Sequence, residues 1–169
     1  GDTVTNYDIV YRVMTLLLFP FSVIAQPLWS SYAAAKANNN YKWINKIINR
    51  LYLFSLFIII GILLLSFTFN FITDIWLGRV YKIELSLKLL IGFLLFNVMW
   101  STIHSDILYG ISAYKFMFIS ILIGLVLKIL VLIILVYTNN LSLNTIVISS
   151  IVGYFLFSSI APFYIKEKI

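Results

Sequence analysis

A lysine interrupts one of the longest apolar stretches of the chain. Lys128 lies in IGLVLKILVLIIL, residues 123–135, whose other residues are all apolar or glycine. A lysine at the centre of a membrane-spanning helix costs about 2.5–3.5 kcal/mol. We therefore expect its ammonium group to face water, a carboxylate or an anionic ligand, or else to bond as a structural group to carbonyls of a neighbouring helix. Ser120 and Gly124 precede it at steps of four, so a strip of small residues shares its helix face and leaves room for a neighbour or a substrate.

Polar residues also run through the apolar segment 9–31. Steps of 3, 7, 4 and 4 residues place five of them on one helix face: Arg12, Thr15, Ser22, Gln26 and Ser30. Pro20 and Pro27 bend this segment, because proline removes a backbone hydrogen bond. A bent helix with a polar stripe suits the wall of a water-filled cavity, although small hydroxyls also bond helices to one another in membranes. Arg12 lies near one end, where it either anchors at the interface or contacts a ligand.

A third apolar segment, 86–108, carries polar residues along one side. Asn97, Ser101, His104 and Ser105 follow that side roughly, and Asp106 comes directly after them. His104 and Asp106 diverge by about 200° on a helix, so they do not form an acid–base pair. We expect Lys88 to reach the membrane interface at one end of the segment, and Asp106 to cap the helix or pair with a loop at the other.

The composition shows what kind of protein must position these groups. The chain is 62% hydrophobic and only 11% charged, which is too apolar for a soluble domain of 169 residues. It has no cysteine and one histidine, so we expect no disulfide, no metal site and no cofactor. The sequence also lacks a glycine-rich phosphate loop, HExxH and GxSxG. We therefore expect an integral membrane protein that is not an enzyme.

The apolar stretches predict an all-α, polytopic membrane helix bundle. Each is long enough to cross about 30 Å of hydrocarbon as a helix, and none alternates as a barrel strand does. The five expected spans cover about 9–31, 51–73, 86–108, 115–137 and 143–165. Between the first two, residues 36–50 have apolar side chains at helical spacing and several lysines, which predicts an amphipathic helix lying on the membrane lipids.

Basic residues are concentrated on one side of these spans. The net charge of +6 therefore indicates topology rather than binding to nucleic acid. If every segment crosses, that side holds Lys36, Lys42, Lys46, Arg50, Lys115, Lys166 and Lys168. The other side has Arg79 and Lys82 beside Asp74 and Glu84. The positive-inside rule places 33–50, 109–115 and the C-terminus in the cytoplasm, and residue 1 outside.

Several stretches resemble a known family. NYDIVYRVMTLLLFPFSVIAQPLWSSYAAA, residues 6–35, is similar to the start of the C-terminal lobe of Wzx-type O-antigen and capsule repeat-unit flippases, within the polysaccharide-transporter family. DIWLG, 74–78, and LYGISAYK, 108–115, resemble two turns of that family, with Tyr109 in place of the usual asparagine. The last two spans match in hydropathy only. The chain opens GDTVTNYD without an initiator methionine, and we expect it to be the C-terminal part of a longer protein.

The resemblance implies five helices of an incomplete C-terminal lobe in a twelve-helix transporter of the bacterial inner membrane. Its partners would be an N-terminal lobe of the same protein, a lipid-linked oligosaccharide and a polysaccharide polymerase. Alternating access would carry an undecaprenyl-pyrophosphate-linked repeat unit across the membrane. Cationic side chains suit a diphosphate, hydroxyls and amides suit sugar hydroxyls, and aromatic rings either stack on sugars or serve as packing. The substrate-binding candidates are Arg12, Lys128, Gln26, Ser22, Asn97, Tyr11 and Trp29.

Three other functions compete with this hypothesis. A lipid II flippase or a drug exporter would share the superfamily, but exporters usually need an intramembrane acid that the apolar cores lack. A polysaccharide polymerase or ligase would be expected to carry a large polar external loop, and segments 74–85 and 138–142 are short. A purely structural membrane subunit leaves Lys128 unexplained.

Overall fold

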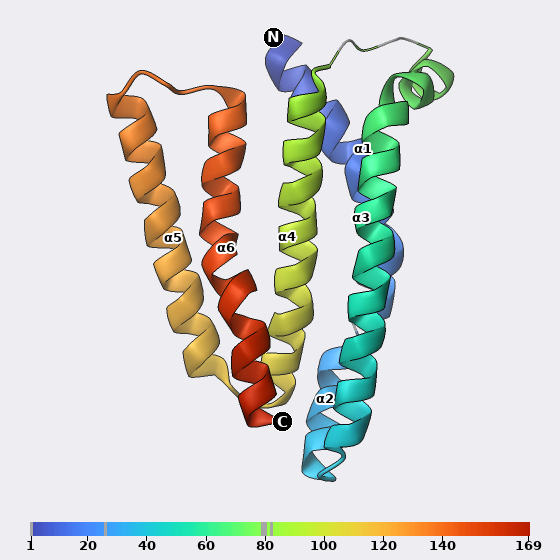
Figure 1. Cartoon of the computed structure of the whole chain (residues 1–169), viewed down its shortest axis with the longest axis vertical. Coiled ribbons are helices and arrows are strands. Elements are labelled where there is room, and N and C mark those ends of the chain that lie inside the picture. Colours follow the sequence, from blue (N-terminus) through green and yellow to red (C-terminus); the bar gives the residue numbers. More distant parts are fainter. Residues whose placement is uncertain (1, 26, 79–80, 82) are drawn as a thin grey trace.

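The protein is a bundle of α-helices with its chain reversing direction at each end (Figure 1). The computed structural model describes residues 2–25, 27–78, 81 and 83–169. Among these residues, five helical stretches are long and apolar enough to cross a membrane, which confirms the predicted all-α membrane bundle. The helices are α1 (Asp2–Ala25), α2 (Leu28–Ala37), α3 (Tyr41–Leu77), α4 (Leu85–Gly110), α5 (Tyr114–Tyr137) and α6 (Leu143–Lys168).

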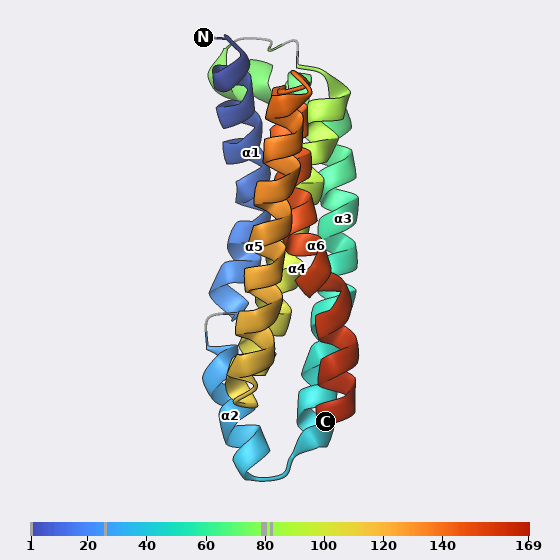
Figure 2. The ribbon, with the colours of Figure 1, turned by 90° about the vertical axis from the view of Figure 1, so that its left-hand side faces the viewer.

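Helix α4 is the centre of the bundle. It packs against α1, α2 and α3 on one side and against α6 on the other, while α5 packs mainly against α6 (Figure 1). The most apolar part of α4 is 56% buried, whereas that of α5 is only 11% buried. The view turned by 90° shows α1 along one edge of the bundle and α3 along the other, with α5 in front (Figure 2). The exposed sides of α3 and α5 are therefore the surfaces that we expect lipid to cover.

The first predicted span is divided into two helices. Helix α1 ends at Ala25, and α2 begins at Leu28 after Pro27. Proline lacks the N–H that would continue the hydrogen-bond ladder, which explains the break at this position. Pro20 lies inside α1 and does not end it. The predicted segment 9–31 therefore covers only part of this element, because α1 starts earlier and α2 ends later.

The basic connector differs from the prediction. Residues 41–50 form the first turns of α3, which runs on without interruption to Leu77. At 1.5 Å per residue, this helix is about 55 Å long, well beyond about 30 Å of hydrocarbon. The basic segment therefore projects along the axis of the span instead of lying flat as a separate amphipathic helix. The apolar spacing at Ile44, Ile48 and Leu51 packs α3 against the core of the bundle.

A proline in α6 explains why this helix is joined to α4. Pro162 provides no N–H for the carbonyl of Ser158, four residues earlier. The indole N–H of Trp100, on α4, donates to that carbonyl at 3.1 Å. The hydroxyls of Ser101 and Ser158 also lie 3.0 Å apart. A neighbouring helix thus satisfies the group that the proline leaves free, as the absence of water in a bilayer requires.

Two glycines allow α5 and α6 to meet. A Cβ atom on Gly124 would collide with the backbone carbonyl oxygen of Gly153. A Cβ atom on Gly153 would in turn lie 3.2 Å from Cβ of Lys128. The predicted strip of small residues before Lys128 therefore faces α6, where Ser120 and Gly124 are buried. Small residues that permit close approach are a common basis for helix packing in membranes.

We expect Gly124→Ala to destabilise the protein by about 1–3 kcal/mol, because the added methyl group meets backbone that cannot move aside. The matched control is Gly61→Ala, whose Cβ would lie 3.5 Å from the flexible side chain of Leu17. That change should be neutral or slightly stabilising, since alanine favours helix more than glycine does. Thermal unfolding of the intact protein in detergent measures both. Equal stability of the two variants would contradict the packing described here.

Candidate functional site

Two adjoining cavities share one face of α4. The first has a volume of about 520 Å³ and is formed by α4, α5 and α6. The second has a volume of about 400 Å³ and is formed by α1, α2 and α4. Both are lined by Val98, Thr102 and Asp106 of α4. We call the two cavities together the α4 groove, since one wall is common to both.

The spacing of residues on α4 produces this wall. Positions 98, 102, 105, 106 and 109 recur at three or four residues and so share one helix face. Two of them, Thr102 and Tyr109, have exposed side chains, and Ser105 and Asp106 are half-buried. The sequence placed Ser101 and Ser105 on a polar side but did not show that α5 and α6 leave this side open. The groove is therefore lined by hydroxyls, one carboxylate and one aromatic ring from α4 alone.

Lys128 lines the first cavity from α5. Its side chain is half-buried, and its stem passes Gly153, with Cδ 3.6 Å from the position that a Cβ would occupy there. The absence of a side chain at Gly153 makes the space through which Lys128 extends. Within the described part of the chain, Lys128 makes no hydrogen bond or ion pair of the kind that a structural lysine makes with neighbouring carbonyls. Its ammonium group is therefore without a protein partner among the described residues.

Lys88 shows how a structural lysine differs. It lies in the first turn of α4, is only 5% exposed, and holds its ammonium group 5.5 Å from the centroid of the Phe69 ring. Cation–π attraction and burial of its stem hold Lys88 against α3, while its place relative to the membrane interface stays a prediction. Among the described residues, Lys88 is thus a buried lysine with an aromatic partner, whereas Lys128 lines a cavity.

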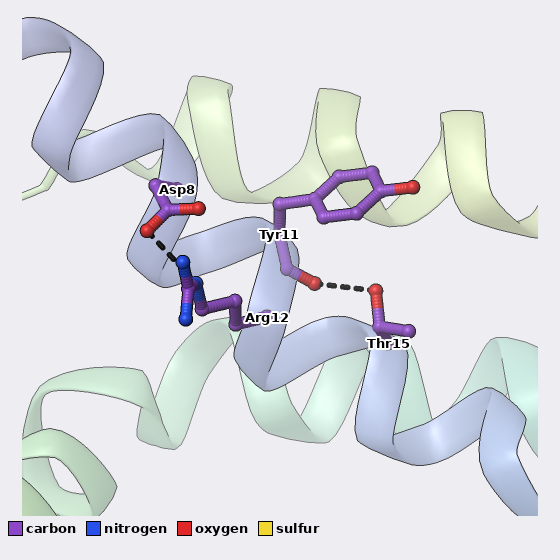
Figure 3. A network of polar contacts seen from close by, with 4 residues as sticks. All are labelled: Asp8, Tyr11, Arg12 and Thr15. Atoms are coloured by element: carbon purple, nitrogen blue, oxygen red, sulfur yellow. Dashed lines mark hydrogen bonds and ion pairs between the residues drawn. The ribbon is translucent and has the colours of Figure 1, made fainter.

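Arg12 lies outside the α4 groove. Its Nε is 2.8 Å from Oδ2 of Asp8, one turn earlier on α1, and its side chain is 75% exposed (Figure 3). Tyr11 stacks against Tyr7 with ring centroids 5.8 Å apart, and it lines neither cavity. The structure therefore does not bring Arg12 and Tyr11 together with Lys128.

The remaining candidates divide between the groove and the core. Ser22 and Trp29 line the second cavity, and Trp29 is 54% exposed. Asn97 is buried, donates from Nδ2 to the carbonyl of Phe93 at 3.0 Å, and lines neither cavity. Its place as a cavity residue is therefore not supported, because its amide serves its own helix. Gln26 lies outside the described residues.

His104 belongs to a packing network on the opposite side of α4. Its Nδ1 lies 2.7 Å from the carbonyl oxygen of Trp100, and its Nε2 lies 2.8 Å from the hydroxyl of Tyr52. A carbonyl only accepts, so Nδ1–H donates to it, and Nε2 of the neutral ring accepts from Tyr52. The Tyr52 and Trp100 rings stack with centroids 4.7 Å apart. Both nitrogens are occupied, so this histidine joins α3 to α4.

Asp106 is the groove residue whose role the sequence did not indicate. The expected cap or loop pair is absent among the described residues, where Arg12 and Asp8 form the ion pair and no hydrogen bond to Asp106 is found. Asp106 instead lines both cavities. Its spacing of four from Thr102 could have shown that it shares the face of the other groove residues, whereas its nearness to the helix end suggested a cap.

Neither a metal centre nor a known relative explains the groove. No group of three or more metal-binding side chains occurs in the portion of the chain that the structure describes. Comparison with family models, curated proteins and solved structures finds no match. The function must therefore be argued from the groove itself.

We expect Tyr52→Phe to destabilise the protein by about 1–3 kcal/mol, because it leaves a buried nitrogen of His104 without its partner. The ring stack on Trp100 is kept, so the change removes only the hydroxyl. Tyr137→Phe is the control, since Tyr137 is 88% exposed and should tolerate the loss. Thermal unfolding in detergent compares them. Unchanged stability of Tyr52→Phe would mean that the bond to His104 contributes nothing.

Proposed function

We propose that this chain forms part of a transporter that moves a lipid-linked oligosaccharide across the bacterial inner membrane. The substrate is an undecaprenyl-diphosphate-linked repeat unit, whose polar head passes through the α4 groove while its lipid tail stays in the bilayer. The residues that contact it are Lys128 on α5, Ser22 and Trp29 near the break between α1 and α2, and the polar face of α4. The C-terminus lies in the cytoplasm, as the basic residues predict.

One observation carries this proposal. Lys128 lies near the middle of an otherwise apolar helix and faces a cavity of about 520 Å³ that also presents Ser101 and Tyr154. A diphosphate is strongly anionic and loses water when it enters the membrane, so it needs a cation at that depth. Of these two hydroxyls, that of Ser101 is bonded to Ser158, so the Tyr154 hydroxyl is the one free to donate to a phosphate oxygen or to the adjoining sugar.

The groove has the form of one wall of a larger passage. Trp29 is exposed at one side and Tyr154 is 41% exposed at the other. A second lobe facing α1, α4 and α5 would enclose this surface, and rocking of the two lobes would open it to each side of the membrane in turn. The superfamily resemblance supports such a pair of lobes.

Asp106 favours a second candidate, an ion-coupled exporter. Such transporters use an intramembrane acid, and Asp106 is a carboxylate that lines both cavities. A cationic amphipathic substrate would then bind at Asp106, and a proton or sodium gradient would drive its release. Lys128 disfavours this function, since it would repel a cation from the same cavity.

The test is translocation by the intact protein in liposomes, with the oligosaccharide detected by a lectin added to one side. We expect Lys128→Ala to slow translocation about tenfold or more, because a charge-assisted contact is lost, and Lys128→Arg to keep part of the rate. Lys46→Ala is the matched control, since Lys46 is exposed on α3 outside the groove. A normal rate for Lys128→Ala at normal protein level would contradict the proposal. Gradient-driven efflux of a cationic dye, without movement of the lipid, would favour the exporter.

A further inference from the structure

Asp106 places a negative charge in the same groove as Lys128. It is half-buried, lines both cavities, and has no salt bridge in the described parts of α1 to α6. A carboxylate repels phosphate, so it does not assist the diphosphate of the proposed substrate. The groove therefore has two chemically different ends, with a carboxylate at one and an ammonium at the other.

The two charges lie at different depths. Asp106 is four residues before the end of α4 at Gly110, and Lys128 is fourteen residues after the start of α5 at Tyr114. The short turn 111–113 joins these helix ends, so the two side chains are offset by about 15 Å along the helix axes. This length exceeds a diphosphate group. A ligand that contacts both residues must extend from its phosphates toward the end of the bundle where α4 and α6 finish.

The surroundings of Asp106 suit a sugar. A carboxylate accepts two hydrogen bonds at once, as neighbouring hydroxyls of a sugar ring can donate. Exposed aromatic rings stand on both sides, with Trp29 in the second cavity and Tyr109, 45% exposed, in the first. Such rings offer apolar faces to the C–H side of a sugar. Thr102, which lines both cavities, donates its hydroxyl proton to the carbonyl of Val98 and so adds an acceptor oxygen only.

We propose that Asp106, with Trp29 and Tyr109, forms a sugar subsite that is separate from the phosphate subsite at Lys128. The inference rests on the proposed function, because it divides one substrate between two parts of the α4 groove. The subsite binds the oligosaccharide part near the membrane surface, while Lys128 binds the diphosphate deeper in the bilayer. Asp106 is therefore a specificity residue and Lys128 a charge-compensating one.

Two ligands separate the subsites. The intact protein, in detergent or nanodiscs, is titrated with undecaprenyl diphosphate and with the undecaprenyl-diphosphate-linked oligosaccharide extracted from cells that express it. We expect Asp106→Asn to weaken binding of the oligosaccharide lipid about tenfold, through loss of charge-assisted hydrogen bonds, and to leave binding of undecaprenyl diphosphate unchanged. Lys128→Ala should weaken both. Asp74→Asn, which changes an exposed carboxylate near the end of α3, should alter neither.

The outcomes distinguish this subsite from the proposed function. If Asp106→Asn leaves both affinities unchanged, or weakens both equally, the sugar subsite is overturned while the role of Lys128 stands. An Asp106→Asn protein with normal affinities that has lost dependence on an ion gradient would assign Asp106 to ion coupling and overturn the subsite in the same way. If the unaltered protein binds neither lipid, the proposed function fails, and the subsite fails with it.

Discussion

A positive charge in the middle of a membrane helix constrains the whole arrangement. Lys128 requires polar surroundings at a depth where lipid provides none, so α5 must turn that face toward other helices. Contact between Gly124 and Gly153 sets this orientation and leaves space for the lysine stem. Helix α5 packs mainly on α6, and α6 is bonded to α4 where Trp100 donates to the carbonyl of Ser158 that Pro162 leaves free. These contacts hold the three helices that form the first cavity around Lys128.

The two sides of α4 show how structural and functional polar groups differ. On one side, His104 has a partner for each nitrogen and Trp100 donates to α6, so these groups contribute packing. On the other side, Thr102 donates to its own helix, and Asp106 faces both cavities without a hydrogen bond or ion pair among the described residues. A buried polar group without a partner is costly, which is why those that serve structure are satisfied and those left open are candidates for binding.

The sequence predicted the fold better than the site. Length and hydropathy identified the spans because lipid admits only helices or closed barrels. Lys128 was noticed because a charged side chain in the middle of a membrane helix has a high free-energy cost. The cavity positions of Asp106 and Tyr109 depend on how α5 and α6 splay from α4, which periodicity does not encode. Arg12 and Asn97 were chosen by residue type, yet one pairs with Asp8 and the other bonds its own helix. The connector 36–50 was predicted to be separate from the next span because the polarity changes between them. A change in polarity does not by itself end a helix, and residues 41–50 belong to α3.

The hydration of Lys128 is tested most directly by thiol accessibility in membranes. The chain has no cysteine, so Lys128→Cys introduces a unique reactive position within it. Thiols react as thiolates and need water, so a membrane-impermeant maleimide should modify Lys128→Cys rapidly. Leu130→Cys, on an exposed position of α5 that lines neither cavity, should react slowly. Equally slow modification of both variants would show that Lys128 faces lipid, and would contradict the proposal that the α4 groove binds a transported substrate.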